Sequence, residues 1–144
     1  MTKSIRQILK SKPVIHSIGP QATVFDALKL MAEKNIGALV VLQGKELAGI
    51  FSERDYARKV ALLGKSSRDT PVSEIMTPKV ITIDSGRTAG ECMALMTEQR
   101  IRHLPVIEGG RLVGVISIGD VVRAVVEEQH FTIKQLESYI TSGG

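Results

Sequence analysis

Short apolar runs alternate with stretches of helical periodicity along this chain. Two apolar runs, at residues 38–42 and 103–107, are each followed by a glycine-containing turn and a second apolar run, at residues 47–51 and 112–117. Runs of this length around a tight turn predict β-hairpins. Ahead of each hairpin, apolar residues recur at helical spacing, which predicts an amphipathic helix. These residues are Val24, Ala27, Leu28 and Met31 before the first hairpin and Ala89, Met93 and Met96 before the second.

Each predicted helix has a clear start and is preceded by a β-rich segment. Thr23 and Thr88 stand where an N-cap belongs, and an acidic residue follows each of them three positions later, as in a capping box. The β-rich segments are Val14–Ile18 and Val80–Ile83, and a turn separates each from its helix. After each hairpin we expect a second helix, from about residue 53 to 63 and from about 118 to 126.

These two sets of elements are copies of one unit. Shifting the chain by 65 residues aligns residues 13–60 with 78–125 without a gap, and 16 of the 48 aligned residues are identical. The sequence therefore contains an internal duplication. The identical residues are Pro13, Ile18, Thr23, Leu30, Met31, Glu33, Ile36, Leu39, Val41, Gly44, Leu47, Gly49, Ser52, Asp55, Arg58 and Val60, each with its counterpart 65 positions later.

The duplication predicts an α/β fold of the α+β kind, built from two tandem β-α-β-β-α repeats. One repeat of about 50 residues is marginal as an independent core, so we expect the two to pack as a pseudo-twofold module. Residues 1–70 are assigned to the first repeat with a lead-in and a connector, and residues 71–144 to the second repeat with a helical tail. Ser4–Leu9 and Val72–Met76 each predict a short lead-in helix, and Gly64–Pro71 reads as the polar connector.

The tail carries a further apolar pattern. Residues Phe131, Ile133, Leu136 and Ile140 recur at roughly helical spacing, which predicts that the tail extends or follows the last helix. Its apolar side chains either pack on their own chain or mediate self-association, and the sequence favours neither.

Composition narrows the class of protein. With 43% hydrophobic and 24% charged residues the chain is typical of a soluble globular protein, and no apolar run is long enough to span a membrane. The N-terminus lacks the apolar core of a secretory signal, and the single cysteine excludes an internal disulfide. We therefore expect a cytoplasmic protein in which Cys92 is a reduced core residue, with a redox role as the lesser alternative.

Charge and residue types also bear on the chemistry. A net charge of +4 permits an anionic ligand, but without Trp and with only three Phe and two Tyr there is little surface for stacking on bases, and no nucleic acid is expected. His16, His103 and His130 are scattered, so no metal is expected. The sequence shows no nucleophile–base pairing and no glycine-rich phosphate loop, so we expect the chain not to be an enzyme.

The end of each repeat carries the candidate chemistry. Gly49–Asp55 (GIFSERD) and Gly114–Asp120 (GVISIGD) place a serine and an aspartate three residues apart, where a buried strand passes into a helix. Unpaired amides at a helix start can hold an anion, and a carboxylate can accept hydrogen bonds from both hydroxyls of a ribose. The same Ser-x-x-Asp pattern is also an ordinary helix N-terminus, so both interpretations stay open.

These residues carry a resemblance to a known family. The repeat, its length and its two endings resemble the cystathionine-β-synthase (CBS) domain. Arg100–Ile107 (RIRHLPVI) is similar to the central strand of that family, and Val72–Pro78 (VSEIMTP) to its entry segment. Ser117–Val126 and the connector are similar to those of stand-alone CBS-pair proteins of bacteria and organelles.

The resemblance implies two symmetry-related clefts, of which one or both bind an adenosine nucleotide: AMP, or else ADP, ATP or NAD. Asp55 and Asp120 are then expected to grip the ribose, and Ser52 and Ser117 to contact ribose or phosphate. Strand residues are expected to lie against the adenine. They are Ser17, Ala38, Leu39 and Val40 in the first repeat and Thr82, Ile83, His103, Leu104 and Pro105 in the second.

Phosphates need cations, and the resemblance suggests where they lie. Arg102 and His103 match positions that are basic in nucleotide-binding relatives, and an arginine can hold a phosphate through two hydrogen bonds. Arg54 lies within the first motif and Arg58 one turn later, and each is otherwise a solvated helix charge. Because the first repeat has glycine and alanine where the second has arginine and histidine, we expect the Asp120 site to be the stronger of the two.

The expected function is a regulatory module that signals energy or cofactor status to an unidentified protein target. The resemblance also implies a homodimer, because CBS pairs commonly associate through their helices. The alternative is a nucleotide-independent protein-interaction module with vestigial clefts. A nucleic-acid-binding protein is a third and weaker reading of the basic charge, and no membrane partner is expected.

Overall fold

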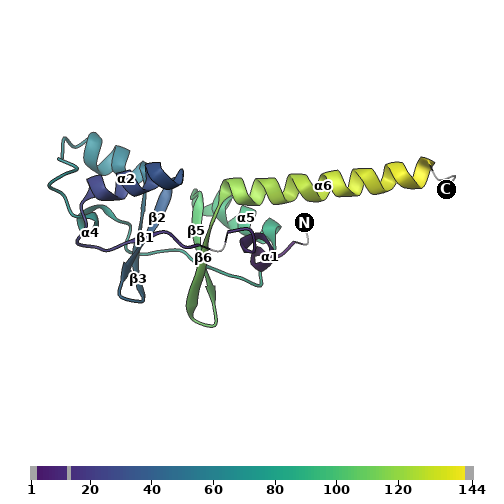
Figure 1. The fold of residues 1–144 in the computed structure, drawn as a ribbon, viewed down its shortest axis with the longest axis horizontal. Coiled ribbons are helices and arrows are strands. Elements are labelled where there is room, and N and C mark those ends of the chain that lie inside the picture. The colour runs from purple at the N-terminus through teal and green to yellow at the C-terminus, as the bar shows by residue number, and fades with distance from the viewer. Residues whose placement is uncertain (1–2, 13, 142–144) are drawn as a thin grey trace. The chain divides into compact units, whose positions relative to one another are not determined.

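The computed structural model describes residues 3–12 and 14–141, and within them it forms two three-stranded sheets flanked by helices (Figure 1). The predicted tandem β-α-β-β-α repeats of a mixed α+β fold are confirmed. The strands are β1 (Ser17–Ile18), β2 (Ala38–Gln43), β3 (Glu46–Ser52), β4 (Ile83–Asp84), β5 (His103–Glu108) and β6 (Arg111–Ser117). The helices are α1 (Ile5–Leu9), α2 (Val24–Lys34), α3 (Glu53–Tyr56), the π-helix η1 (Ala57–Ala61), α4 (Val72–Ile75), α5 (Ala89–Gln99) and α6 (Ile118–Thr141).

Both sheets have the same topology. In each, a two-residue strand pairs in parallel with the first strand of a hairpin, β1 with β2 and β4 with β5. The hairpin strands then pair antiparallel, β2 with β3 and β5 with β6. A register shift interrupts each hairpin at equivalent places, between Val41 and Leu42 and between Val106 and Ile107. The duplication therefore extends to local irregularities of the backbone.

The predicted helix starts at Thr23 and Thr88 are confirmed. The Thr23 hydroxyl accepts a hydrogen bond from the Asp26 amide at 3.1 Å, and the Thr88 hydroxyl accepts one from the Glu91 amide at 3.1 Å. In the second repeat the Glu91 carboxylate also accepts from the Thr88 amide, which completes a capping box. The sequence pattern thus located the first residue of both α2 and α5.

Several predicted boundaries are wrong. The segments Val14–Ile18 and Val80–Ile83 form strands only at Ser17–Ile18 and Ile83–Asp84, because only two residues of each find partners on the neighbouring hairpin. The second helix of the first repeat changes type, because after α3 the Leu62 amide bonds the carbonyl five residues earlier. Its counterpart α6 continues through the tail to residue 141 instead of ending near residue 126.

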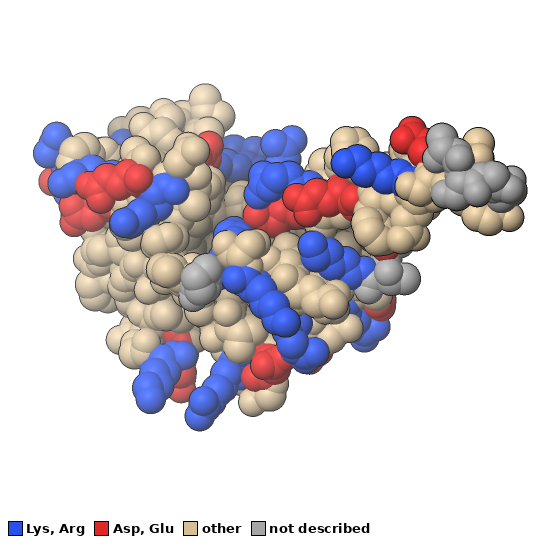
Figure 2. Space-filling model, turned by 45° about the vertical axis from the view of Figure 1, so that its right-hand side comes forward, with Lys and Arg blue, Asp and Glu red and all other residues tan. Residues whose placement is uncertain are grey.

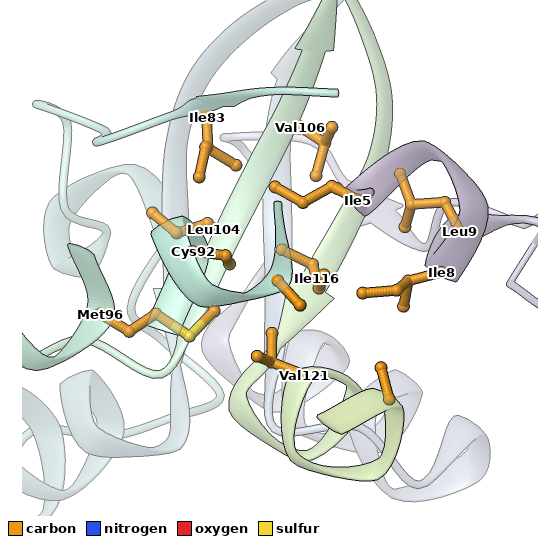
Figure 3. Close-up of a cluster of buried hydrophobic side chains, with 12 residues drawn as sticks. Ile5, Ile8, Leu9, Ile83, Cys92, Met96, Leu104, Val106, Ile116 and Val121 are labelled. Carbon is orange, nitrogen blue, oxygen red and sulfur yellow. The ribbon is translucent and has the colours of Figure 1, made fainter. Parts of the chain in front are cut away.

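Each sheet has its own apolar core. Figure 3 shows the core of the second repeat, where α1, α5 and α6 place apolar side chains against β5 and β6. Cys92 is fully buried there, as predicted, and burial raises the pKa of its thiol to about 11. Its buried members are Ile5, Ile8, Leu9, Ile83, Ala89, Cys92, Met96, Leu104, Val106, Ile116, Val121 and Ala124. The core of the first repeat contains Val24, Ala27, Met31, Leu39, Val41, Phe51, Val60, Val72 and Ile75.

The lead-in helix of the first repeat packs on the second repeat. Ile5, Ile8 and Leu9 of α1 enter the core beneath β5 and β6. The backbone fixes this docking, since the Ile5 amide donates to the Arg87 carbonyl at 2.9 Å and the Ala89 amide donates to the Lys3 carbonyl at 2.9 Å. A helix of five residues is too short to be stable alone, so α1 depends on these contacts.

The lead-in helix of the second repeat packs in the same way on the first. Val72 and Ile75 of α4 enter the core with α2, and the Val72 amide donates to the Ala22 carbonyl at 2.8 Å. Ala22 and Arg87, the two carbonyl acceptors, are 65 residues apart and therefore equivalent. The two repeats have thus exchanged their lead-in helices.

The compact units of the structure follow this exchange. One unit comprises residues 1–14 and 82–144, and the other comprises residues 15–81. The division at residues 70 and 71 follows the repeat along the sequence. The spatial division differs from it because each sheet keeps the lead-in helix that covers it, whichever repeat supplies that helix.

Gly49 and Gly114 lie where the lead-in segments approach the hairpins. A Cβ on Gly49 would lie 2.6 Å from Met76 Sδ and 2.9 Å from the Thr77 backbone oxygen, whereas one on Gly114 would lie 2.9 Å from Leu9 Cδ1. A backbone oxygen yields less easily than the end of a leucine side chain. Gly49→Ala is therefore expected to lower the free energy of unfolding by about 1–3 kcal/mol and Gly114→Ala by less, measured by urea unfolding with circular dichroism.

Gly19→Ala is the matched control, because nothing lies within 4 Å of a Cβ built at that position. Its unfolding midpoint should stay close to that of the wild type. Equal losses of stability for Gly19→Ala and Gly49→Ala would contradict the close-packing explanation.

Candidate functional site

The first Ser-x-x-Asp motif forms the start of α3. The Ser52 hydroxyl accepts from the Asp55 amide at 3.2 Å, and Asp55 Oδ2 accepts from the Ser52 amide at 2.9 Å. Asp55 Oδ1 receives two further contacts, from Thr77 Oγ1 at 3.3 Å and from Lys59 Nζ at 3.3 Å. The motif therefore caps a helix and also collects polar partners around one carboxylate.

The second motif forms the start of α6 with the same hydrogen bonds. The Asp120 amide donates to the Ser117 hydroxyl at 3.2 Å, and the Ser117 amide donates to Asp120 Oδ2 at 2.8 Å. Here both added partners are cations. Lys12 Nζ lies 2.8 Å from Oδ2, and Arg123 Nη2 lies 2.7 Å from Oδ1.

Lys12 and Thr77 play equivalent parts in the two repeats. They are 65 residues apart and each precedes a proline in the sequence. The Thr77 amide donates to the Ile50 carbonyl at 2.8 Å, while Lys12 Nζ donates to the Val115 carbonyl, the equivalent acceptor, at 3.3 Å. One ammonium group thus makes in the second repeat the contacts that the amide and hydroxyl of Thr77 share in the first.

Asp120 is an ionised carboxylate in a buried position. Its side chain is only 5% exposed, and this burial by itself would raise its pKa. The hydrogen bonds from Lys12 and from the Ser117 amide outweigh burial, so the pKa of Asp120 is lowered below its usual value. A carboxylate held charged in this way is a strong acceptor for a polar ligand.

His103 lies close enough to this cluster to sense its charges. Burial, followed by the positive charge of Lys12, lowers the pKa of His103, and the nearby Asp120 carboxylate opposes this only in part. The imidazole is therefore mostly neutral at pH 7 and offers hydrogen bonds, not charge. The positive charge of the second repeat comes from Lys12, Arg123 and the exposed Arg102.

The strand residues predicted to contact adenine divide between the two faces of each sheet. Leu39 and Leu104 are fully buried core residues, so only their backbone groups can reach a ligand. Residues Ala38, Val40 and Pro105 alternate with them along β2 and β5 and lie on the opposite faces.

The remaining predicted residues lie in less enclosed places. Ile83 belongs to the core, whereas Ser17 and Thr82, at or beside the short parallel strands, are exposed. Arg54 is exposed on α3 and Arg58 is exposed on η1. No contact between a ligand and any of these residues is tested by the fold alone, so their roles stay predictions.

Sequence reasoning did not select Lys12, Thr77, Lys59 or Arg123 as site residues. The repeat itself held the signal for two of them, because Lys12 and Thr77 align at the position before the shared proline. Their contact with the motif aspartates arises from the exchange of lead-in helices. The local sequence around each motif does not reveal that exchange.

The described part of the chain contains no group of three or more His, Cys, Asp and Glu side chains that could hold a metal ion. Among the same residues, no helix has both the length and the hydropathy to span a membrane. Figure 2 shows Lys and Arg interspersed with Asp and Glu over the visible face. That face lacks the continuous basic stripe typical of nucleic-acid binding.

Comparison with known proteins gives the family. A family model described as CBS domain matches residues 5–62 and again residues 72–127. The chain belongs to the CBS domain family. The two matches correspond to the two repeats, and they confirm the resemblance drawn from the duplicated GIFSERD and GVISIGD endings.

Relatives carry the same domains in plants and bacteria. The CBS domain-containing protein CBSX3, mitochondrial, of Arabidopsis thaliana is 48% identical over 126 residues, which are 84% of this chain and 61% of that protein. The CBS domain-containing protein YhcV of Bacillus subtilis (strain 168) is 30% identical over 106 residues, covering 74% of this chain and 75% of the relative. This chain thus spans less than two thirds of the Arabidopsis protein.

A solved structure shows the same fold. A CBS-domain protein from Burkholderia ambifaria MC40-6 has 53% sequence identity and a TM-score of 0.85, over 88% of this chain and 96% of the other. Sequence and fold therefore agree on a pair of CBS repeats. The chemistry of the site must be argued from the residues of this chain.

Lys12→Met should weaken the second repeat, since it keeps an aliphatic stem and removes the ammonium from a buried carboxylate. We expect the free energy of unfolding at pH 7 to fall by roughly 1–2 kcal/mol. Because the pKa of Asp120 is lowered, its stabilising effect is complete above the unfolded value near pH 4 and is lost as the pH falls through the lower folded value. The difference between wild type and variant should therefore shrink below about pH 4 in urea titrations.

Lys10→Met, at an exposed position of the same segment, is the control and should leave stability unchanged. A deficit in Lys12→Met that stays constant from pH 7 down to pH 2 would indicate that Lys12 acts through packing alone. That result would contradict an ionic role for its contact with Asp120.

Proposed function

We propose that this chain is a regulatory CBS-pair module that binds an adenosine nucleotide, and that it is not an enzyme. The family membership supports a regulatory role, and the Burkholderia ambifaria relative is named as a candidate signal-transduction protein. We extend that role to this chain, with energy or cofactor status as the signal and an unidentified protein as the target. A cytoplasmic location belongs to the same proposal.

The arrangement around Asp120 is the observation that carries the proposal. A buried carboxylate, kept ionised, lies 2.8 Å from Lys12 and 2.7 Å from Arg123 at the start of a long helix. A nucleotide combines vicinal hydroxyls, which a carboxylate binds, with phosphates, which lysine and arginine bind. Both kinds of group are present within this one cluster.

The contacts of Asp120 also indicate how a ribose would be accommodated. Oδ2 is held by the Ser117 amide and Lys12, whereas Oδ1 is bonded to Arg123, whose side chain is 69% exposed. An exposed arginine can turn away at little cost, since surface ion pairs contribute little stability. We infer that Arg123 turns from the carboxylate toward a phosphate and leaves Oδ1 to a ribose hydroxyl.

The first repeat is the weaker site in this proposal. Its aspartate has the neutral Thr77 where the second repeat has Lys12, and it has Gly37 and Ala38 in place of Arg102 and His103. Lys59, which contacts Asp55, supplies positive charge there, and the exposed Arg54 and Arg58 lie nearby in sequence. With fewer cations near the carboxylate, we expect weaker binding of phosphorylated ligands.

Isothermal titration calorimetry with AMP, ADP, ATP, NAD and adenosine tests the proposal. We expect AMP-containing ligands to bind. Asp120→Asn should weaken AMP binding at least about tenfold, because an amide offers only one acceptor oxygen to the two ribose hydroxyls.

Asp55→Asn is the matched variant in the other repeat and should have the smaller effect on the tighter binding step. Circular dichroism should show that both variants remain folded. If none of the five ligands binds to folded wild-type protein, the nucleotide proposal is wrong.

A second function is favoured by the hydrogen bonds that the motifs already make. Both serine hydroxyls accept helix amides, and both aspartates accept the amide of their own serine, so the motifs serve as complete helix caps. This arrangement fits a protein-interaction module that needs no nucleotide. Absence of binding to all the ligands above, with the fold intact, would favour this second function.

A further inference from the structure

The C-terminal half of α6 leaves its own unit. The core contacts of α6 end with Ala124 and Val125, the family match ends at residue 127, and the helix continues to Thr141. Figure 1 shows this yellow-green half extending past α1 and α5 of the same unit. Every residue from 129 to 140 is exposed. A helical segment of this length without tertiary contacts is marginal in water, so it calls for a partner.

One face of α6 carries a heptad pattern. Successive positions on this face are separated by four, three, four, three and four residues, which is the spacing of a coiled-coil seam. We call these six residues the α6 seam: Val122, Val126, Gln129, Ile133, Leu136 and Ile140. Its apolar members are exposed by 45% at Val122, 43% at Val126, 51% at Ile133, 59% at Leu136 and 72% at Ile140.

We propose that the α6 seam pairs in parallel with the α6 seam of a second copy of this chain, forming a short two-stranded coiled coil. This inference goes beyond nucleotide binding and does not depend on it. It also differs from association through the CBS repeats, because most of the seam lies beyond the residues that the family model matches.

The residue types along the seam favour a parallel pair of identical helices. The a positions are Val126, Ile133 and Ile140, all β-branched, and β-branched residues at a favour two parallel strands. The single polar member, Gln129, occupies a d position. In a parallel pair it faces its own copy, and two amides can hydrogen-bond to each other. In an antiparallel pair it would face Ile133 and lose a partner on burial.

The contact area sets the expected strength. The seam spans 18 residues from Val122 to Ile140, or about 27 Å of helix. About a dozen a, d, e and g positions a side is roughly half the 20–30 residues of a standard interface, so each partner buries on the order of 400 Å². That area belongs to weak, reversible complexes. We therefore expect a dimer that forms with rising protein concentration.

Disulfide cross-linking of the full chain tests the register. Leu136→Cys places a thiol at a d position, opposite its own copy, whereas Phe131→Cys places one at an equally exposed position off the seam. Under mild oxidation, Leu136→Cys should form covalent dimers at least about tenfold faster, because the seam holds its two thiols at high effective concentration. The native Cys92 is buried and should stay unlinked.

Sedimentation equilibrium of glutamate variants tests the energetics. Ile133→Glu should weaken self-association about 100-fold or more, since two apolar side chains leave the seam and two carboxylates replace them. Phe131→Glu removes an equally large apolar group off the seam and should leave the dissociation constant unchanged.

The proposal is overturned by equal cross-linking rates at positions 131 and 136, or by equal effects of the two glutamate variants. Faster linkage between a Val126→Cys chain and a Leu136→Cys chain than between two Leu136→Cys chains would indicate antiparallel helices and would overturn the parallel arrangement. All these positions are on the exposed side of α6, so circular dichroism should show that each variant folds.

Discussion

The exchange of lead-in helices is the constraint on which the rest of the structure depends. Each sheet needs a helix to close the edge of its core, and α1 and α4 supply it through Ile5 and Val72, both fully buried. Neither repeat uses the lead-in that directly precedes it. A chain cut at the repeat boundary would therefore separate each sheet from its covering helix, and the two repeats can reach their full stability only together.

The same exchange accounts for the difference between the two candidate sites. The residue after each lead-in helix reaches the motif aspartate of the repeat it covers, Lys12 reaching Asp120 and Thr77 reaching Asp55. A threonine adds only a neutral hydrogen bond, whereas a lysine adds a charge beside a carboxylate that is 5% exposed. One substitution between duplicated lead-ins is enough to give the two carboxylates different electrostatic surroundings.

Sequence patterns predicted what depends on local interactions and missed what depends on distant ones. The N-caps Thr23 and Thr88, the hairpins and the two motif helix starts follow from residues within a few positions of each other. The length of β1 depends on which residues of β2 remain available as partners, and that is not encoded near Ser17. Lys12 likewise lies 108 residues from Asp120, so no local pattern could place it in the site.

The two repeats also diverge after their motif helices, and the exchange explains where. In the first repeat the chain must turn back soon after η1, because Val72 has to dock beside Ala22 to cover the first sheet. The wider π-turn and the left-handed Gly64 end the helix in time for that turn. The described part of the second repeat has no later lead-in to deliver, so α6 is free to continue. What limits the first helix is thus absent from the second, and the released length carries the α6 seam.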